Sequence, residues 1–226
     1  MRLFFRYLPL SLVLMSCSFE SSAGNPVLYK EHFDFYKFGE TLKETTFQWT
    51  MRFKDKSKKK IPFNNCNEIT VFNQKDIALF DQFRFKLFVA DCTALYKFSD
   101  AKTFNKTYFQ KDLNTGFITS LPANIAPIIN DHIFTKQKNK SFEEAYTVTK
   151  VQKKNKSVNI YSKEDHFSIK VLARGDFDED GLEDLLIASE WYARNARGKF
   201  NDLVIVTKKS ANKPIEITWR IHKSIW

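Results

Sequence analysis

The sequence lacks the short motifs that identify the common classes of hydrolase. It contains no GxSxG segment, which would place a serine nucleophile on a sharp turn. Its four histidines include no HExxH pair for a catalytic zinc ion. The adjacent acids Glu143 and Glu144 make a poor glycosidase pair, because neighbouring side chains need not face one cleft. These absences leave catalysis undecided and favour a protein that is not an enzyme.

Cysteines and long apolar runs are also scarce. None of the three cysteines belongs to a CxxC pair or lies near a histidine, which argues against a zinc site. No stretch reaches the roughly 20 apolar residues that a membrane-spanning helix needs. The segment from Met1 to Met15 instead combines Arg2 and Arg6 with a short apolar stretch, which is typical of a secretory signal peptide.

The end of this segment, Leu14-Met15-Ser16-Cys17, resembles a bacterial lipobox, in which a leucine and a small residue precede the lipid-bearing cysteine. The resemblance implies a signal peptide with lipobox over residues 1–17, lipidation of Cys17 and a flexible tether over residues 18–25. The expected location is the bacterial cell envelope, with the protein anchored by lipid in the outer membrane and facing the periplasm. Cleavage after Ser21-Ser22-Ala23 is the alternative and would leave a soluble secreted or periplasmic protein.

The cysteine count is odd, so a secreted chain must account for the cysteine left over. If Cys17 carries lipid, Cys66 and Cys92 remain as an even pair. We predict that they form a disulfide in an oxidising periplasm, which would contribute about 3 kcal/mol to stability. Two buried free thiols are the alternative.

The charge balance points to acidic partners. The net charge is +10, and loss of Arg2 and Arg6 lowers the basic count from 36 to 34 against 26 acids, which leaves +8. Such a surface favours anionic lipid headgroups, anionic envelope polymers or an acidic protein. The lysine-rich run from Lys54 to Lys60 fits either a contact with nucleic acid or a solvated hairpin loop. Because no RNA-binding aromatic signature accompanies it, we expect no specific nucleic-acid partner.

Hydrophobic periodicity predicts an α+β fold, mainly antiparallel sheet with a few short helices. In the N-terminal region, residues 26–155, alternation predicts strands over Phe47–Phe53 and Phe83–Val89, followed by a helix that Asp91 caps. The C-terminal region, residues 156–226, is predicted to be one antiparallel sheet. Its candidate strands are Val158–Tyr161, Phe167–Leu172, Leu185–Trp191, Leu203–Thr207 and Ile215–Ile221.

An acidic loop between two of these strands carries the clearest chemical signal. Alternate aspartates can point at one centre when the loop curls, and calcium takes about six to eight oxygen ligands at roughly 2.3–2.6 Å. Gly181 would supply the backbone freedom that a sharp loop needs. The proposed ligands are Asp176, Asp178, Asp180, the backbone carbonyl of Leu182, and Asp184.

This loop, with its DxDxDGxxD spacing and a following apolar strand, resembles the FG-GAP or VCBS-type repeat. The resemblance implies a structural calcium ion (Ca2+) held by the C-terminal region. It covers about residues 167–208 and occurs once, in a chain too short for a propeller of several four-stranded blades, so we expect no full propeller. The flanking strands distinguish the loop from an EF-hand, which has helices on both sides.

Three functions fit these features. The leading hypothesis is a calcium-binding envelope lipoprotein that acts as a binding module, as an inhibitor or immunity-type protein does. The alternatives are an envelope hydrolase whose active site follows no short motif, and a surface adhesin or structural protein. The expected partners are the membrane, through the lipid, and a protein or an anionic envelope polymer. The oligomeric state does not follow from the sequence.

Overall fold

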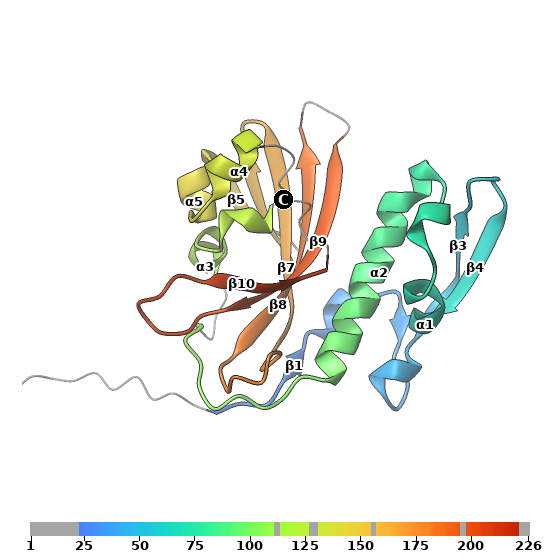
Figure 1. Cartoon of the computed structure of the whole chain (residues 1–226), viewed down its shortest axis with the longest axis horizontal. Helices are drawn as coiled ribbons and strands as arrows, with labels where there is room; N and C mark the ends of the chain where they lie inside the picture. Colours follow the sequence, from blue (N-terminus) through green and yellow to red (C-terminus); the bar gives the residue numbers. More distant parts are fainter. Residues whose placement is uncertain (1–22, 111–113, 127–130, 155–156, 195–197, 222–226) are drawn as a thin grey trace, which may run out of the picture.

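The computed structural model of the chain describes residues 23–110, 114–126, 131–154, 157–194 and 198–221 (Figure 1). Its main element is a seven-stranded sheet in which six strands follow the order β10-β9-β8-β7-β6-β5, every pair antiparallel. The predicted C-terminal sheet is therefore confirmed. Its strands are β5 (Val148–Lys154), β6 (Ser157–Ser162), β7 (Asp165–Gly175), β8 (Asp184–Ala193), β9 (Lys199–Thr207) and β10 (Glu216–Arg220).

The seventh strand, β1 (Val27–Leu28), comes from the start of the described chain. It pairs with the Ala173–Arg174 end of β7, beyond the segment of β7 that pairs with β6. Both β1 and β5 precede residue 156, so the sheet draws strands from the N-terminal region as well as from the C-terminal one. Within the described residues the sheet is a single layer, in agreement with the expectation that the chain forms no propeller.

A second, three-stranded sheet lies apart from the first. It consists of β2 (Tyr36–Lys37), β3 (Thr46–Lys54) and β4 (Lys60–Asn65), which confirms the strand predicted over Phe47–Phe53. The lysine-rich run joins β3 to β4 as a hairpin loop. Asp55 organises this loop, because its carboxylate accepts hydrogen bonds from the Ser57 hydroxyl at 2.7 Å and the Lys59 N–H at 2.8 Å.

The predicted strand over Phe83–Val89 is wrong, because these residues lie inside the helix α2 (Leu79–Ser99), and Asp91 lies within that helix and does not cap it. Residues two apart in a helix point in nearly opposite directions, since each residue turns by about 100°. Phe83 contacts the ring of Tyr192 on the large sheet, whereas Phe85 contacts Phe53 on the small sheet. The alternation arose because α2 has an apolar layer on both sides.

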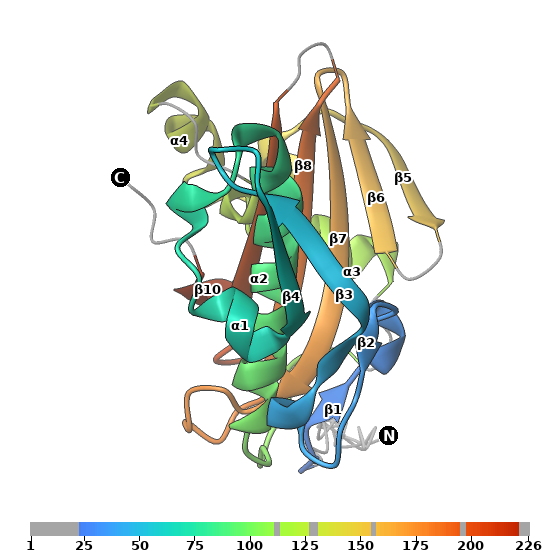
Figure 2. The same cartoon turned by 90° about the vertical axis from the view of Figure 1, so that its right-hand side faces the viewer.

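Figures 1 and 2 show α2 between the large sheet and the small one. The buried side chains of α2 join those of the small sheet and one face of the large sheet in a single hydrophobic cluster, which includes Phe53, Phe85 and Leu203. The opposite face of the large sheet forms a second cluster with short helices, which includes Phe142 and Val204. The large sheet is therefore buried on both faces.

The remaining helices are short. Ser141 begins a one-turn helix with a capping box, in which the Glu144 N–H donates to the serine hydroxyl and the Glu144 carboxylate accepts from the Ser141 N–H. The helices are α1 (Cys66–Thr70), α3 (Thr115–Thr119), α4 (Asp131–Gln137) and α5 (Phe142–Ala145), with single turns at Lys30–His32, Leu42–Glu44, Gln74–Asp76 and Ala123–Ile125. No helix among the described residues is both long and apolar enough to cross a membrane.

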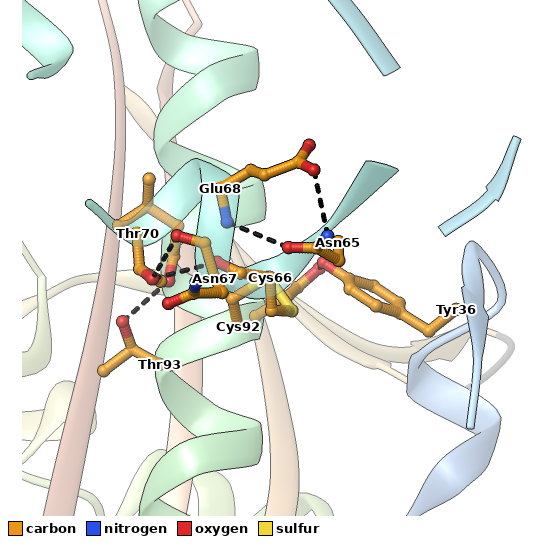
Figure 3. The surroundings of a disulfide bond; sticks show 10 residues. Tyr36, Asn65, Cys66, Asn67, Glu68, Thr70, Cys92 and Thr93 are labelled. Carbon is orange, nitrogen blue, oxygen red and sulfur yellow. Dashed lines mark hydrogen bonds between the residues drawn. A yellow bond between two sulfur atoms is a disulfide. The ribbon is translucent and has the colours of Figure 1, made fainter. Parts of the chain in front are cut away.

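The predicted disulfide is present between Cys66, at the start of α1, and Cys92, in the middle of α2 (Figure 3). Both cysteines are buried in the hydrophobic cluster around α2. Just before Cys66, the Asn65 side chain caps α1 by accepting the N–H of Glu68 at 2.9 Å. The bond therefore fastens a capped one-turn helix, and with it the end of β4, to the central helix.

Candidate metal centre

The acidic loop joins β7 to β8 at one end of the large sheet, the lower end in Figure 2. Gly175 pairs with Asp184 across the two strands, so the sheet register itself brings the first and last aspartates of the loop, Asp176 and Asp184, to its base. Two residues of the loop have positive φ: Gly181 at 80°, as the motif predicts, and Glu179 at 65°. The hairpin is thus tightly curled, as a shared ligand centre requires.

The structure brings three of the four predicted aspartates together. Asp176, Asp178 and Asp184 each offer an oxygen atom, and these atoms lie within 4.8 Å of one another. Oxygens bound to one calcium ion at about 2.3–2.6 Å lie at most roughly 5 Å apart, so this spacing fits a single ion. Asp176 is 3% exposed and Asp184 is fully buried, while Asp178 is open to solvent. The three carboxylates form a site that can hold a metal ion.

The other two predicted ligands lie outside this group of three. The Asp180 carboxylate instead accepts the N–H of Leu182 at 2.8 Å, which fixes the turn around Gly181. Among the described residues, no donor bonds to the Leu182 carbonyl oxygen. That oxygen is therefore available to an ion, and Asp180 remains a predicted ligand that the present arrangement uses as a turn former.

Backbone N–H groups hold the carboxylates in position. Asp176 accepts from Glu179 at 2.7 Å and from Gly181 at 2.8 Å, one bond to each oxygen. Asp184 accepts from the Phe177 N–H at 2.9 Å and from the Thr207 hydroxyl on β9. The aspartates at the base of the loop are thus oriented by the loop and by the sheet.

Electrostatics at the site favour a cation. Burial raises the pKa of Asp184 to about 7, despite hydrogen bonds that favour its charged form. The pKa of Asp178 is also raised, first by burial and then by the neighbouring charges of Asp180 and Asp176. A bound cation reverses both effects, because it compensates desolvation and like-charge repulsion at the same time.

A segment far away in the sequence completes the site. Lys102 and Asp176 exchange two backbone hydrogen bonds, at 2.9 and 3.1 Å, and the Asn105 N–H donates to the Gly181 carbonyl at 2.8 Å. The Glu183 N–H donates to the Lys106 carbonyl at 2.8 Å. The sequence gives no sign of this segment, because most of its contacts are made by backbone atoms about 75 residues from the motif, and its side-chain bond from Thr107 to Glu183 follows no local spacing.

Glu183 was also missed. This acid is 3% exposed and forms a two-pronged ion pair with Arg174, at 2.7 and 2.8 Å, while the Thr107 hydroxyl donates to the same carboxylate. Glu183 is therefore committed to Arg174 and not to a metal ion. The one available signal was a basic residue, Arg174, directly before the acidic run.

The predicted signal peptide and Cys17 lie outside the described residues. The predicted site residues inside them fall into two separate places, the disulfide at α2 and the acidic loop at the end of β7. No family model matches the chain, and neither a curated protein nor a solved structure matches it.

Proposed function

We propose that the chain is a calcium-binding lipoprotein of the bacterial cell envelope that works by binding a partner, in the manner of an inhibitor or immunity-type protein. The observation that carries the proposal is the set of three carboxylates with oxygens within 4.8 Å of one another at the base of the β7–β8 loop. The spacing of the three carboxylates, the burial of Asp176 and Asp184, and the raised pKa values of Asp178 and Asp184 support a cation as the occupant.

The choice of calcium rests on the donors. All ligand candidates are oxygens, whereas zinc in proteins is bound mainly by cysteine sulfur and histidine nitrogen. Magnesium requires a nearly ideal octahedron and keeps several water molecules, while calcium accepts an irregular shell of carboxylates and carbonyls. The three grouped aspartates would supply part of such a shell, and on binding calcium the Leu182 carbonyl and Asp180 would complete it.

The ion would have a structural role. Asp184 belongs to β8, and Asp176 is bonded through its backbone to Lys102. An ion between these aspartates therefore joins the sheet, the loop and the segment around residues 102–107. Such an ion would hold one edge of the molecule rigid for a partner, and the basic surface of the mature chain favours an acidic protein or an anionic envelope polymer.

Thermal unfolding of the full chain with and without calcium tests the metal. Saturating calcium should raise the melting temperature, because an ion at about 100 times its dissociation constant adds roughly 2.7 kcal/mol. Asp178→Asn should abolish most of this increment, since it removes one charge from the ligand group. Glu179→Gln is the matched control, because Glu179 neighbours Asp178 but lies outside the group, and it should keep the increment. Equal calcium increments in both variants and the wild type would refute the site.

Separate experiments test the location and the mode of action. Cys17→Ser should release the protein from membranes, and continued membrane retention would contradict lipidation.

A pull-down from envelope extracts in calcium should recover a protein or polymer, and an empty pull-down would count against a binding function. Protease treatment of intact cells should spare a protein that faces the periplasm, whereas cleavage would favour the adhesin alternative.

A further inference from the structure

A cavity of about 400 Å³ lies between α2, β3 and the face of the large sheet that α2 covers. Three neighbouring strands contribute polar side chains to it: Lys170 from β7, Glu190 from β8 and Asn201 from β9. Glu190 and Asn201 are directly opposite each other in the sheet register. They lie toward the end of β8 that is remote from Asp184, so the cavity is distinct from the acidic loop.

Asn201 is the first sign that this cavity takes a ligand. Its side chain is 3% exposed, yet neither its amide nitrogen nor its amide oxygen has a hydrogen-bond partner among the described residues. A buried amide without partners costs free energy, so such groups are normally satisfied by protein, water or ligand. Asn201 offers both a donor and an acceptor to a molecule in the cavity.

Asp91 is the second sign. It points from α2 to the same cavity, where the Tyr36 hydroxyl donates to one of its oxygens at 3.2 Å. The nearby ammonium group of Lys170 is held by Glu190 at 3.0 Å, and Glu190 also accepts from the Tyr192 hydroxyl. Among the described residues no basic side chain forms an ion pair with Asp91. The half-buried Asp91 carboxylate thus has Lys170 as its nearby positive charge, and the Lys170 ammonium is bonded to Glu190 and not to Asp91.

The opposite wall is aromatic. Phe35 contacts Trp49 and Phe88 with ring centroids 5.6 and 5.9 Å apart, and all three rings line the cavity. Trp49 is 53% exposed and Phe35 is 47% exposed, so these rings also reach solvent. Aromatic faces attract ammonium groups and apolar bodies, and they give no binding to anions.

We propose that this cavity binds a small organic cation, whose apolar ring or chain lies against Phe35, Trp49 and Phe88, whose ammonium group pairs with Asp91, and whose hydroxyl or amide group bonds to Asn201. An anionic ligand is disfavoured, because the Asp91 carboxylate would repel it. The lysine and the arginine in the lining are both engaged: Lys170 pairs with Glu190, and the Arg84 guanidinium lies over the Phe53 ring with Asp81 at 3.9 Å. The combination of an apolar wall with a few convergent polar groups is that of an ordinary small-molecule site. This site is independent of the metal centre.

The protonation of Asp91 supports the assignment. Burial raises the pKa of Asp91 to about 7, whereas Lys170 and the Tyr36 hydroxyl act in the opposite direction and Glu190 adds to the rise. His32 and Asp202 line the same cavity. An ammonium group next to Asp91 would lower its pKa, so cation binding releases a proton below neutral pH and weakens as the pH falls.

Titration calorimetry of the full chain at pH 8 with three probes tests the site. Phenylalaninol carries the amine, the hydroxyl and the ring; hydrocinnamyl alcohol lacks only its amine, and phenethylamine lacks only its hydroxymethyl group. The wild type should bind phenylalaninol about tenfold or more tightly than either relative, a ratio that corresponds to one good polar contact. Binding of phenylalaninol should weaken from pH 8 to pH 5.

Two variants assign the contacts. Asp91→Asn keeps an acceptor for Tyr36 and should bind phenylalaninol no better than hydrocinnamyl alcohol. Asn201→Leu keeps the branched shape of the side chain but replaces both amide atoms by methyl groups, and it should bind phenylalaninol no better than phenethylamine. Asp178→Asn, at the acidic loop, should leave all three affinities unchanged, which separates this site from the metal centre.

Equal affinity of the wild type for phenylalaninol and hydrocinnamyl alcohol would overturn the proposal, as would no heat of binding at millimolar concentration. Both of these tests use only the wild-type protein, so they remain decisive even if Asp91→Asn or Asn201→Leu fails to fold. Loss of discrimination in Asp178→Asn would also overturn it, because the cavity would then depend on the metal centre.

Discussion

Two sets of cross-linking interactions, here called fastenings, hold distant parts of this fold together, and they differ in kind. At α2, a disulfide between Cys66 and Cys92 crosses an apolar cluster. At the β7–β8 loop, the fastening is polar: a buried ion pair between Arg174 and Glu183, backbone hydrogen bonds to a distant segment, and three carboxylates suited to a metal ion. The first depends on redox state, and we expect the second to depend on pH and on a bound metal ion.

The difference shows where each fastening is needed. The small sheet and α1 contact the rest of the molecule largely through α2, and the disulfide ties them to it covalently. The acidic loop is a hairpin end that has few apolar side chains to bury, so polar contacts must position it. The two fastenings should therefore fail independently, each in response to its own agent.

The largest expected effect is at the buried ion pair. Glu183→Gln leaves the Arg174 guanidinium, whose side chain is 11% exposed, without its charged partner, and breaking such a pair is expected to lower the free energy of unfolding by about 3–5 kcal/mol. Because Glu183 adjoins Asp184, calcium binding should weaken as well. Urea unfolding with and without calcium measures both effects.

The exposed pair between Lys209 and Glu216 is the matched control for this change. Its side chains are 59% and 49% exposed, so Glu216→Gln should alter the free energy of unfolding by less than about 1 kcal/mol. If Glu183→Gln were equally mild, the polar fastening would not be a source of stability, and the contrast with the disulfide would disappear.

Removal of the disulfide should have the next largest effect. Cys66→Ala combined with Cys92→Ala opens a loop with a sequence separation of 26 residues, and we expect a loss of about 3 kcal/mol. The increase in melting temperature on adding calcium should stay the same as in the wild type. A smaller calcium increment in the double variant would show that the two fastenings are coupled.

The sequence revealed much of the large sheet, the disulfide and the acidic loop, for physical reasons. The strand over Ile215–Ile221 alternates clearly, because it has one apolar and one polar face. The acidic loop was recognisable because ion ligands in a hairpin must follow one another at fixed spacing. The cysteines were predicted to pair by counting alone, and no geometry was required.

What the sequence concealed was contact between distant elements. The helix α2 has apolar residues on all sides because it lies between two sheets, so Phe83 and Phe85 gave the alternation of a strand. The segment around Lys102 meets the acidic loop mainly through its backbone, and its side-chain bond from Thr107 to Glu183 follows no local spacing in the sequence. The cavity at Asp91 and Asn201 needs three strands and a helix to form, and none of its residues belongs to a local motif.

The smallest expected effect concerns Asp91, a carboxylate that belongs to neither fastening. Its pKa is about 7 in the fold, against about 3.9 in an unfolded chain, so the folded state binds more protons between these values. The contribution of Asp91 to the free energy of unfolding is therefore most favourable below about pH 4, and it is lost as the pH rises to about 7. Asp91→Asn removes this dependence and should be more stable than the wild type at pH 8. We expect a gain on the order of 1 kcal/mol or a few degrees, less than the roughly 4 kcal/mol of the full shift, because Asp91 is only half-buried and solvent screens its charge.

Melting temperatures of both proteins at pH 5 and pH 8, in calcium throughout, measure the difference, which should be larger at pH 8. Asp55→Asn is a control of opposite sign, because the Ser57 hydroxyl bonds to Asp55 and lowers its pKa. Its effect should be destabilising and equal at the two pH values, both of which lie above the window in which it titrates. If Asp91→Asn destabilised the protein equally at both pH values, Asp91 would be a structural acceptor for Tyr36. A gain at pH 8 together with loss of phenylalaninol binding would mean that the fold keeps an unfavourable carboxylate because its ligand requires it.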